Sequence, residues 1–294
     1  MNFRALFISM KKIFPRPVTM EFIHNMKRRK LTAEEEKIPY AKYFHKKLAE
    51  IPAADLEIVN NGPVDAALAL SIDQRNDLMK PGYLPVETGY TVMPDGSGFA
   101  ATLVKMPGVT PEMLDWWFNW HPLEGLRYAL WCPVAHTDIS VKDKSVHLDS
   151  SGIPLKERNY GKVHYPVEGF NVAQADTIRI EFFSPADYGL DMNLFKKPNI
   201  SRAYCANCII DTMNIPFNVF FHAVREVEGG VEFRSRYWLW KNMQKGGIIK
   251  GVRFPKIHKM IDLSRNNCLH SLTEYNNLAS FLPQLYAEMG GKIE

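Results

Sequence analysis

The sequence predicts an α+β fold in which a curved, predominantly antiparallel sheet wraps around a long C-terminal helix. Short runs rich in β-branched and aromatic residues occur between residues 86 and 240, with turn-forming Pro, Asp and Gly between several of them. The C-terminal region instead carries apolar residues at helical spacing and ends at Gly290 and Gly291, a typical stop signal for a helix. A sheet closed by one helix in this way leaves a cavity between the two layers.

The first 85 residues are expected to form a smaller, mostly helical region. Thr32 and Glu35 have the spacing of a capping box, which predicts a helix over residues 31–51. Pro39 is expected to kink or delay that helix, because proline lacks the backbone N–H that a helix interior requires. A second short helix is expected over residues 67–79, where the chain approaches a Pro-Gly turn.

The sheet is expected to begin with a strand, a turn and a strand over residues 86–107, because the sequence Pro-Asp-Gly-Ser-Gly between them is turn chemistry. A helix should follow, with Thr110 as its N-cap and Pro111 in its first position. Further strands are expected over residues 176–183, 216–227 and 231–240, and the Glu-Gly-Gly sequence between the last two predicts a hairpin.

The final helix is expected to start within residues 264–268 and to end at Met289. Its leucines and Phe281 form a broad apolar stripe, and Pro283 should bend it. If the stripe packs on the concave side of the sheet, polar residues on the same helix face are carried into the cavity.

Composition limits the partners. The chain has 294 residues, 46% of them hydrophobic, and a net charge of +4. The basic run at residues 27–30 belongs to no nucleic-acid-binding motif, so no nucleic-acid partner is expected. No apolar run is long enough to span a membrane, and the apolar N-terminal stretch is short and interrupted by Arg4. A cytoplasmic location is therefore expected.

The four cysteines fit a reducing compartment, and Cys205 and Cys208 form a Cys-x-x-Cys pair. A structural zinc site would require a second such pair, and a redox site would require a βαβ context; neither occurs. Two ordinary thiols are the preferred interpretation.

His270 and Glu274 are four residues apart on the final helix and so share one of its faces. Such a pair can hold a metal or can be an ordinary polar pair, and zinc requires three or four ligands. Candidates for the remaining ligands are His136, Glu168 and His164, although an isolated histidine is more often a satisfied structural group.

His222 lies in an apolar strand, where alternation puts it on one face with Phe220 and Val224. It can be hydrogen-bonded scaffolding or a general acid or base, for which its near-neutral pKa is suited. Tyrosines in the same half of the chain, among them Tyr128 and Tyr237, could hydrogen-bond a phenolic or carbonyl oxygen, although most such residues serve packing.

Taken in order, residues 115–136, 164–170, 221–240 and 270–289 resemble the phloretin hydrolase and 2,4-diacetylphloroglucinol hydrolase family, and residues 106–121 are the most distinctive stretch. The resemblance implies a zinc-dependent hydrolase that cleaves the carbon–carbon bond between a phloroglucinol ring and an acyl group. It implies a Bet v 1-like helix-grip catalytic domain over residues 86–294. Residues 1–85 would form a small N-terminal region that supports a homodimer.

The same resemblance implies a role for each candidate residue. His222 would be the catalytic histidine, and Tyr128 and Tyr237 would bind oxygens of a small aromatic ketone substrate. The zinc ligands would be His136, Glu168, His270 and Glu274, with His121 as a competitor for the position of His136. The acyl group stays open between the bulky one of phloretin and the acetyl groups of mono- and diacetylphloroglucinol.

A non-catalytic binder of a hydrophobic or aromatic small molecule is the alternative, because helix-grip folds also carry ligands without chemistry. The ligand set distinguishes the two classes. A pure carrier has no need to gather two histidines and two carboxylates around one point.

Overall fold

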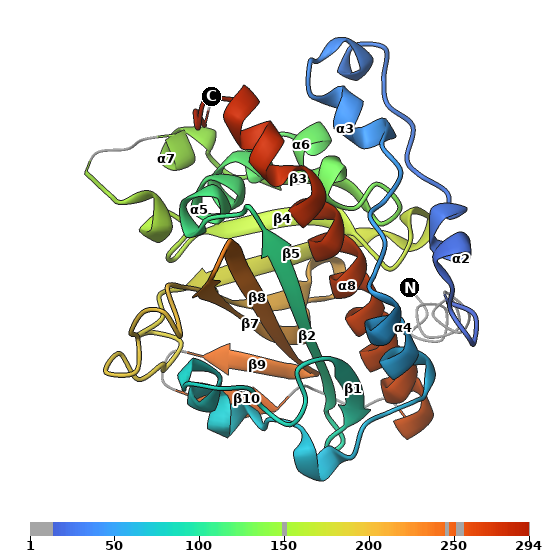
Figure 1. Ribbon diagram of the computed structural model, residues 1–294, viewed down its shortest axis with the longest axis vertical. Coiled ribbons are helices and arrows are strands. Elements are labelled where there is room, and N and C mark those ends of the chain that lie inside the picture. Colours follow the sequence, from blue (N-terminus) through green and yellow to red (C-terminus); the bar gives the residue numbers. More distant parts are fainter. Residues whose placement is uncertain (1–13, 149–151, 245–246, 251–255, 294) are drawn as a thin grey trace.

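The computed structural model describes residues 14–148, 152–244, 247–250 and 256–293. Within them, one eight-stranded antiparallel sheet lies against the long C-terminal helix α8 (Ile257–Glu288), as Figure 1 shows. The strand order is β1-β2-β8-β7-β6-β5-β4-β3. The predicted combination of a large antiparallel sheet and a long C-terminal helix is confirmed, and this arrangement is compatible with a helix-grip fold.

Some consecutive strands are joined by hairpins and others by longer connections. The two hairpins predicted from turn residues, β1–β2 and β7–β8, are both present, and Gly229 has a φ of 75° between β7 and β8. The strands of the large sheet are β1 (Gly89–Val92), β2 (Gly98–Pro107), β3 (His136–Val141), β4 (Val163–Glu168), β5 (Asp176–Phe183), β6 (Arg202–Ile210), β7 (Ile215–Val227) and β8 (Gly230–Leu239). A separate two-stranded sheet contains β9 (Lys241–Gln244) and β10 (Gly247–Lys250).

Short helices fill the connections. The α-helices before α8 are α2 (Met20–His24), α3 (Ala41–His45), α4 (Ala53–Asn60), α5 (Pro111–Trp120), α6 (Gly125–Trp131) and α7 (Lys144–Leu148). Tighter 3₁₀ turns are η2 (Glu35–Lys37), η3 (Ala66–Leu68), η4 (Ile72–Met79), η5 (His121–Leu123), η6 (Leu155–Glu157), η7 (Val172–Gln174) and η8 (Asp211–Met213). Helix α5 begins as predicted, since the Thr110 side chain accepts a hydrogen bond from Met113 N and Pro111 occupies the first turn.

The capping box is formed, but the helix predicted over residues 31–51 is wrong. Thr32 N donates to the Glu35 carboxylate at 2.8 Å and Glu35 N donates to the Thr32 hydroxyl at 3.1 Å. Only the 3₁₀ turn η2 follows, because Ile38 is extended before Pro39 and the chain restarts as the single turn of α3. The helix predicted over residues 67–79 is likewise replaced by η3 and η4.

Helix α8 starts at Ile257, earlier than the predicted range of 264–268. Its first turns carry Ile257, Met260 and Ile261 at helical spacing between polar residues. Met260 and Leu263 bury these turns against the sheet. The apolar spacing therefore extends further toward the N-terminus than the predicted start of the helix.

Both faces of the sheet are covered. The inner face packs on α5, α6 and α8 in one large buried core, and this core also contains N-terminal residues such as Tyr43 and Val59. The outer face packs under η4 and residues 184–200 in a second core around Phe99, Phe221 and Trp238. The division of the chain at residue 85 stays a prediction, and residues 1–13 lie outside the described part.

Cys205 and Cys208 lie on opposite faces of β6, because three residues along a strand reverse the side-chain direction. Cys205 belongs to the outer core, whereas Cys208 faces the inner side. All four cysteines lie in the described part of the chain and are free and buried. The pair therefore shares neither a metal nor a disulfide, which agrees with the preferred interpretation.

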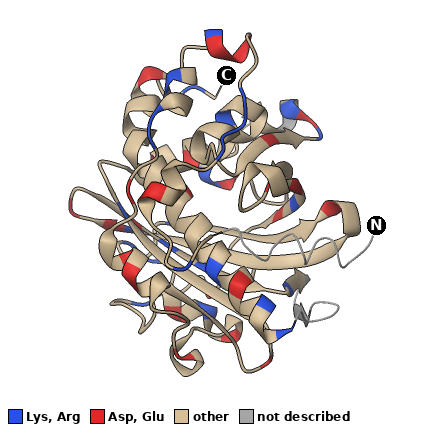
Figure 2. Cartoon of the chain, turned by 90° about the vertical axis from the view of Figure 1, so that its right-hand side faces the viewer, with Lys and Arg blue, Asp and Glu red and all other residues tan. Residues whose placement is uncertain are grey.

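Charged side chains of both signs are interspersed over the elements that face the viewer in Figure 2. None of the helices in the described residues has the length and apolar character that a membrane crossing requires.

Candidate metal centre and active-site cavity

A cavity of about 260 Å³ lies between the inner face of the sheet and α8. Strands β4 to β8 form one wall, α8 forms the opposite wall, and α5 and α6 close one end. Most of its surface is aromatic or aliphatic, with a small number of imidazole, carboxyl, amide and phenol groups. A largely apolar cavity with a few convergent polar groups is the usual form of a small-molecule site.

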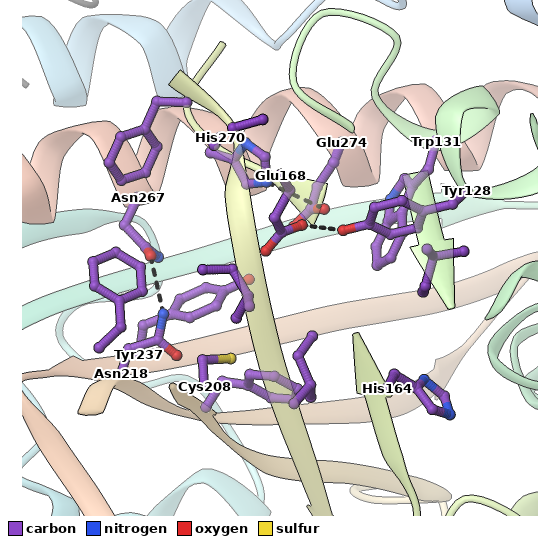
Figure 3. A pocket seen from close by; sticks show the side chains of 18 of the residues that line it. Tyr128, Trp131, His164, Glu168, Cys208, Asn218, Tyr237, Asn267, His270 and Glu274 are labelled. Atoms are coloured by element: carbon purple, nitrogen blue, oxygen red, sulfur yellow. Dashed lines mark hydrogen bonds and ion pairs between the residues drawn. The ribbon is translucent and has the colours of Figure 1, made fainter. Parts of the chain in front are cut away.

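His136, His270 and Glu274 come together at one end of β3 and on one face of α8, with one ligand atom from each lying within 4.8 Å of the others. His270 and Glu274 line the cavity, and His136 lies buried behind them. The Nε2 atoms of the two histidines are 3.3 Å apart. Glu274 Oε2 is 3.5 Å from His136 Nε2 and 3.7 Å from His270 Nε2. In Figure 3, His270 and Glu274 extend from α8 toward Glu168 on the opposite wall.

Two kinds of local geometry create this group. His270 and Glu274 are one helical turn apart on α8, as their spacing predicted. His136 is the first residue of β3 and pairs directly with Glu168, the last residue of β4. The rigid ends of two strands and one helix face therefore meet at the same point.

Glu168 lies beside the compact group rather than within it. Its Oε2 atom is 3.4 Å from His136 Nε2 and accepts a hydrogen bond from the Tyr128 hydroxyl. The Tyr128 ring stacks on His136, with the ring centroids 4.1 Å apart and the planes 3° from parallel. Tyr128, predicted to bind substrate, thus also orients one carboxylate and one imidazole of the cluster.

Burial governs the protonation of these four groups. It raises the pKa of Glu168 to about 7 although the bond from Tyr128 acts in the opposite direction. It also holds the pKa of Glu274 well above its usual range, with a further contribution from Glu168. Burial lowers the pKa of His270 to about 4, and burial together with the neighbouring His270 holds the pKa of His136 well below its usual range. Both imidazoles are therefore neutral and keep a lone pair for a ligand.

The donor set fits a divalent cation. Two neutral imidazoles and two carboxyl groups are borderline and hard ligands that zinc accepts. Two ionised carboxylates would balance the charge of such a cation, whereas without it they are costly to bury. The triad of His136, His270 and Glu274 is thus a possible metal site, with Glu168 next to it.

His121, the competing ligand, lies elsewhere in the cavity wall. Its Nδ1–H donates to the Trp117 carbonyl at 2.7 Å, and its ring stacks between Trp117 and Tyr128. It does not belong to the compact group of ligand atoms found among the described residues. The geometry therefore favours His136.

His222 faces the cavity from β7, in the alternation with Phe220 and Val224 that the sequence predicted. Its Nδ1 lies 2.9 Å from the Ser235 hydroxyl and its Nε2 lies 3.1 Å from the Tyr275 hydroxyl. Burial lowers its pKa to about 3, so the imidazole is neutral. A neutral imidazole between two hydroxyls can accept or pass on a proton.

The sequence interpretation missed Ser235 and Tyr275. Ser235 pairs with His222 across the β7–β8 hairpin, and the register that its tight turn implies would have predicted this pair. Tyr275 gave a weaker signal, because it follows Glu274 directly and its position depends on the rotation of α8.

Tyr237 lines the cavity and donates from its hydroxyl to Ser271 on α8 at 3.1 Å. Ser271 is in turn 2.9 Å from the Thr102 hydroxyl, so a short polar chain links β8, α8 and β2. Burial raises the pKa of Tyr237 well above its usual range, which keeps the hydroxyl protonated as a donor.

A cavity next to a cluster of neutral imidazoles and buried carboxyl groups is typical of an enzyme active site. The family model described as "DAPG hydrolase PhiG domain" matches residues 68–287. The chain belongs to this family and is a hydrolase, as the resemblance predicted.

Curated relatives are similar over most of their length. A 2,4-diacetylphloroglucinol hydrolase of Pseudomonas sp is 32% identical over 272 residues, which cover 86% of this chain and 88% of the relative. A protein of the same name from Pseudomonas protegens is 31% identical, with 86% and 85% covered. A phloretin hydrolase of Eubacterium ramulus is 31% identical over 268 residues, with 87% and 92% covered.

Proposed function

We propose that this protein is a zinc-dependent hydrolase that cleaves the carbon–carbon bond between a phloroglucinol-type ring and its acyl group. The products would be the phenol and a carboxylic acid. The observation that carries this proposal is the meeting of two imidazoles and two carboxyl groups beside a largely apolar cavity. The names of the relatives support the choice of acyl-phloroglucinols as substrates.

His136, Glu168, His270 and Glu274 would hold the zinc ion through two Nε2 atoms and two carboxylates. When bound there, the ion supplies Lewis acidity to oxygen atoms in the cavity. Tyr128 would support the site by donating to Glu168 and by fixing the ring plane of His136.

The reaction requires a ring carbon to leave the acyl carbonyl. A polyhydroxylated ring permits this, since a hydroxyl can tautomerise to a ketone and make the bond part of a β-diketone. Water then adds its oxygen to the acyl carbon, the carbon–carbon bond breaks, and the ring carbon takes up a proton. The chain must therefore hold the ring oxygens and move a proton.

His222 would move that proton. Its Nε2 atom faces the Tyr275 hydroxyl, which lines the cavity, so a proton can pass between the cavity and His222 through that hydroxyl. Ser235 holds the other ring nitrogen and so fixes the orientation of the imidazole. The hydroxyl oxygens of Tyr128 and Tyr237 would accept hydrogen bonds from ring hydroxyls and so orient the ring, while their own protons stay bonded to Glu168 and Ser271.

We also propose that residues 86–294 form a Bet v 1-like helix-grip domain. Residues 1–85 would contribute to the interface of a homodimer, and the protein would act in the cytoplasm. The arrangement of one antiparallel sheet, one long helix and a cavity between them supports the fold. Light scattering coupled to gel filtration tests the dimer, and a monomer at micromolar concentration would contradict it.

Chromatography of products tests the function. Zinc-loaded protein is incubated with phloretin and with mono- and diacetylphloroglucinol, and the expected result is phloroglucinol-type product from at least one of them. His270→Ala should lose both bound zinc and turnover. His45→Ala, at an exposed histidine on α3, is the matched control and should keep both. Binding of all three ketones without cleavage of any would instead favour the non-catalytic binder.

A further inference from the structure

Two amide side chains meet across the cavity, beside the metal-ligand cluster. Asn218 extends from β7 and Asn267 from α8, so they come from opposite walls, as Figure 3 shows. Each residue is 5% exposed, and both line the cavity. Asn218 Nδ2 donates to Asn267 Oδ1 at 3.5 Å, which is the outer limit of a hydrogen bond.

The side-chain amide oxygen of Asn218, Oδ1, lacks a hydrogen-bond partner among the described residues. Buried amide oxygens are almost always paired, since an unpaired one loses its bond to water and gains nothing. An asparagine in an apolar strand face next to Phe220 therefore destabilises the protein unless a ligand supplies the missing donor.

The position of the pair relative to the cluster indicates which ligand group it meets. Asn267, His270 and Glu274 lie on one face of α8, and Asn267 precedes His270 by about 4.5 Å along the helix axis. That length is similar to the width of an aromatic ring. Tyr237, on the same sheet face as Asn218, adds a phenol beside the pair. A ring that lies next to His270 thus directs a substituent between the two amides.

We propose that Asn218 and Asn267 bind a ring hydroxyl of the substrate and select a polyhydroxylated ring; this inference rests on the proposed function. The hydroxyl donates to Asn218 Oδ1 and accepts from Asn267 Nδ2. A hydroxyl is both donor and acceptor, so it can satisfy one amide oxygen and one amide N–H at the same time, whichever of the two residues supplies each. A methyl group satisfies neither amide.

The affinities of a polar and an apolar ligand with the same ring test this assignment. The double variant Asn218→Leu/Asn267→Leu replaces both amides by apolar side chains of similar size. Calorimetric titration of the full-length, metal-free protein uses phloroglucinol and mesitylene, which have the same ring and three substituents each. The variant should bind phloroglucinol at least about 10-fold more weakly than wild type, whereas mesitylene should bind equally or more tightly.

Ile210→Val is the matched control, because Ile210 lines the same cavity without a polar group. It should change both affinities in the same direction and by less than about threefold. Equal changes for the two ligands in the double variant, or no binding of phloroglucinol by wild type, would overturn the assignment.

Thermal unfolding of the unliganded proteins separates recognition from a structural role. Replacing a poorly paired buried amide pair by leucines should leave the Tm unchanged or higher, whereas amides that serve the fold would give a lower Tm. The single variant Asn218→Leu removes the unpaired oxygen together with the bond to Asn267, and it gives the ligand-polarity readout if the double variant does not fold. If the variants lose affinity for phloroglucinol but wild type cleaves no acyl-phloroglucinol, the assignment of the amide pair is supported and the proposed function is rejected. If wild type cleaves an acyl-phloroglucinol but the variants bind phloroglucinol and mesitylene as wild type does, the proposed function is supported and the assignment of the amide pair is rejected.

Discussion

Glu168→Gln should stabilise the metal-free protein at alkaline pH, although it should impair metal binding. Burial raises the pKa of Glu168 from 4.5 to about 7, because the ionised carboxylate loses water without gaining a cation. The glutamine amide keeps an oxygen that can accept the bond from Tyr128 but has no proton to lose. The variant therefore removes the free-energy cost of a buried ionised carboxylate and keeps the hydrogen bond from Tyr128.

The sign and size of the effect follow from the two pKa values. Because the folded protein holds this proton more tightly than the unfolded chain, the stabilising contribution is complete below pH 4.5 and is lost as the pH rises through 7. The side chain is 22% exposed, so solvent screens the cost only in part. At pH 8 the loss amounts to about 3 kcal/mol. For a chain of 294 residues this corresponds to a Tm difference of about 5 °C.

Thermal unfolding of chelator-treated wild type and variant at pH 4.5 and pH 8 measures this difference. The variant should have the higher Tm at pH 8 and nearly the same Tm at pH 4.5. Zinc at pH 8 should then raise the Tm of wild type far more than that of the variant. Glu57→Gln, at an exposed position of α4, is the control and should show neither effect. A variant less stable than wild type at pH 8, or equally stabilised at both pH values, would refute the assignment of an uncompensated buried carboxylate.

His222→Ala should keep bound zinc, but its turnover should fall at least about 100-fold because a positioned proton carrier is removed. Metal analysis and a turnover assay measure the two properties, and normal turnover would reject the proton-transfer role of His222. Tyr128→Phe removes the hydrogen bond to Glu168, so zinc affinity should fall about 10- to 100-fold in a chelator competition titration; an unchanged affinity would show that this bond does not support the site. Glu87→Ala leaves the buried guanidinium groups of Arg234 and Arg236 without their shared carboxylate. Its free energy of unfolding should therefore fall by about 3–5 kcal/mol in urea denaturation, and a loss below about 1 kcal/mol would contradict this.

Local signals predicted those parts of the fold that depend on nearby residues. The Thr110 cap, the turn between β1 and β2 and the β7–β8 hairpin each require only a few neighbouring residues, and all three are formed. The long helix predicted over residues 31–51 is wrong because its capping box forms without it. Extended backbone before Pro39 ends the turn that the box begins.

Some residues of the candidate site could likewise be predicted from local spacing, and others could not. Helical spacing alone brings His270 and Glu274 together, since they are one turn apart. The neighbourhood of His136 and Glu168 depends on the pairing of β3 with β4 across a long irregular connection, and no short turn sets that register. The residues alone offered His136 and Glu168 as candidates beside His164, and the family resemblance selected these two for the cluster. The role of each residue stays a prediction, whereas the close approach of these side chains from β3, β4 and α8 is a property of the fold.

Helix α8 links the three groups that the proposed reaction requires. Glu274 faces the metal-ligand cluster, and the next residue, Tyr275, is turned by about 100° around the axis and reaches His222. Asn267, two turns earlier, reaches Asn218 on the opposite wall. Because one rigid helix carries all three contacts, a shift along its axis would displace the metal ligands, the proton carrier and the amide pair together. Under the proposed function, a bound ligand and cation would offset the cost in stability of the polar groups on this buried helix face.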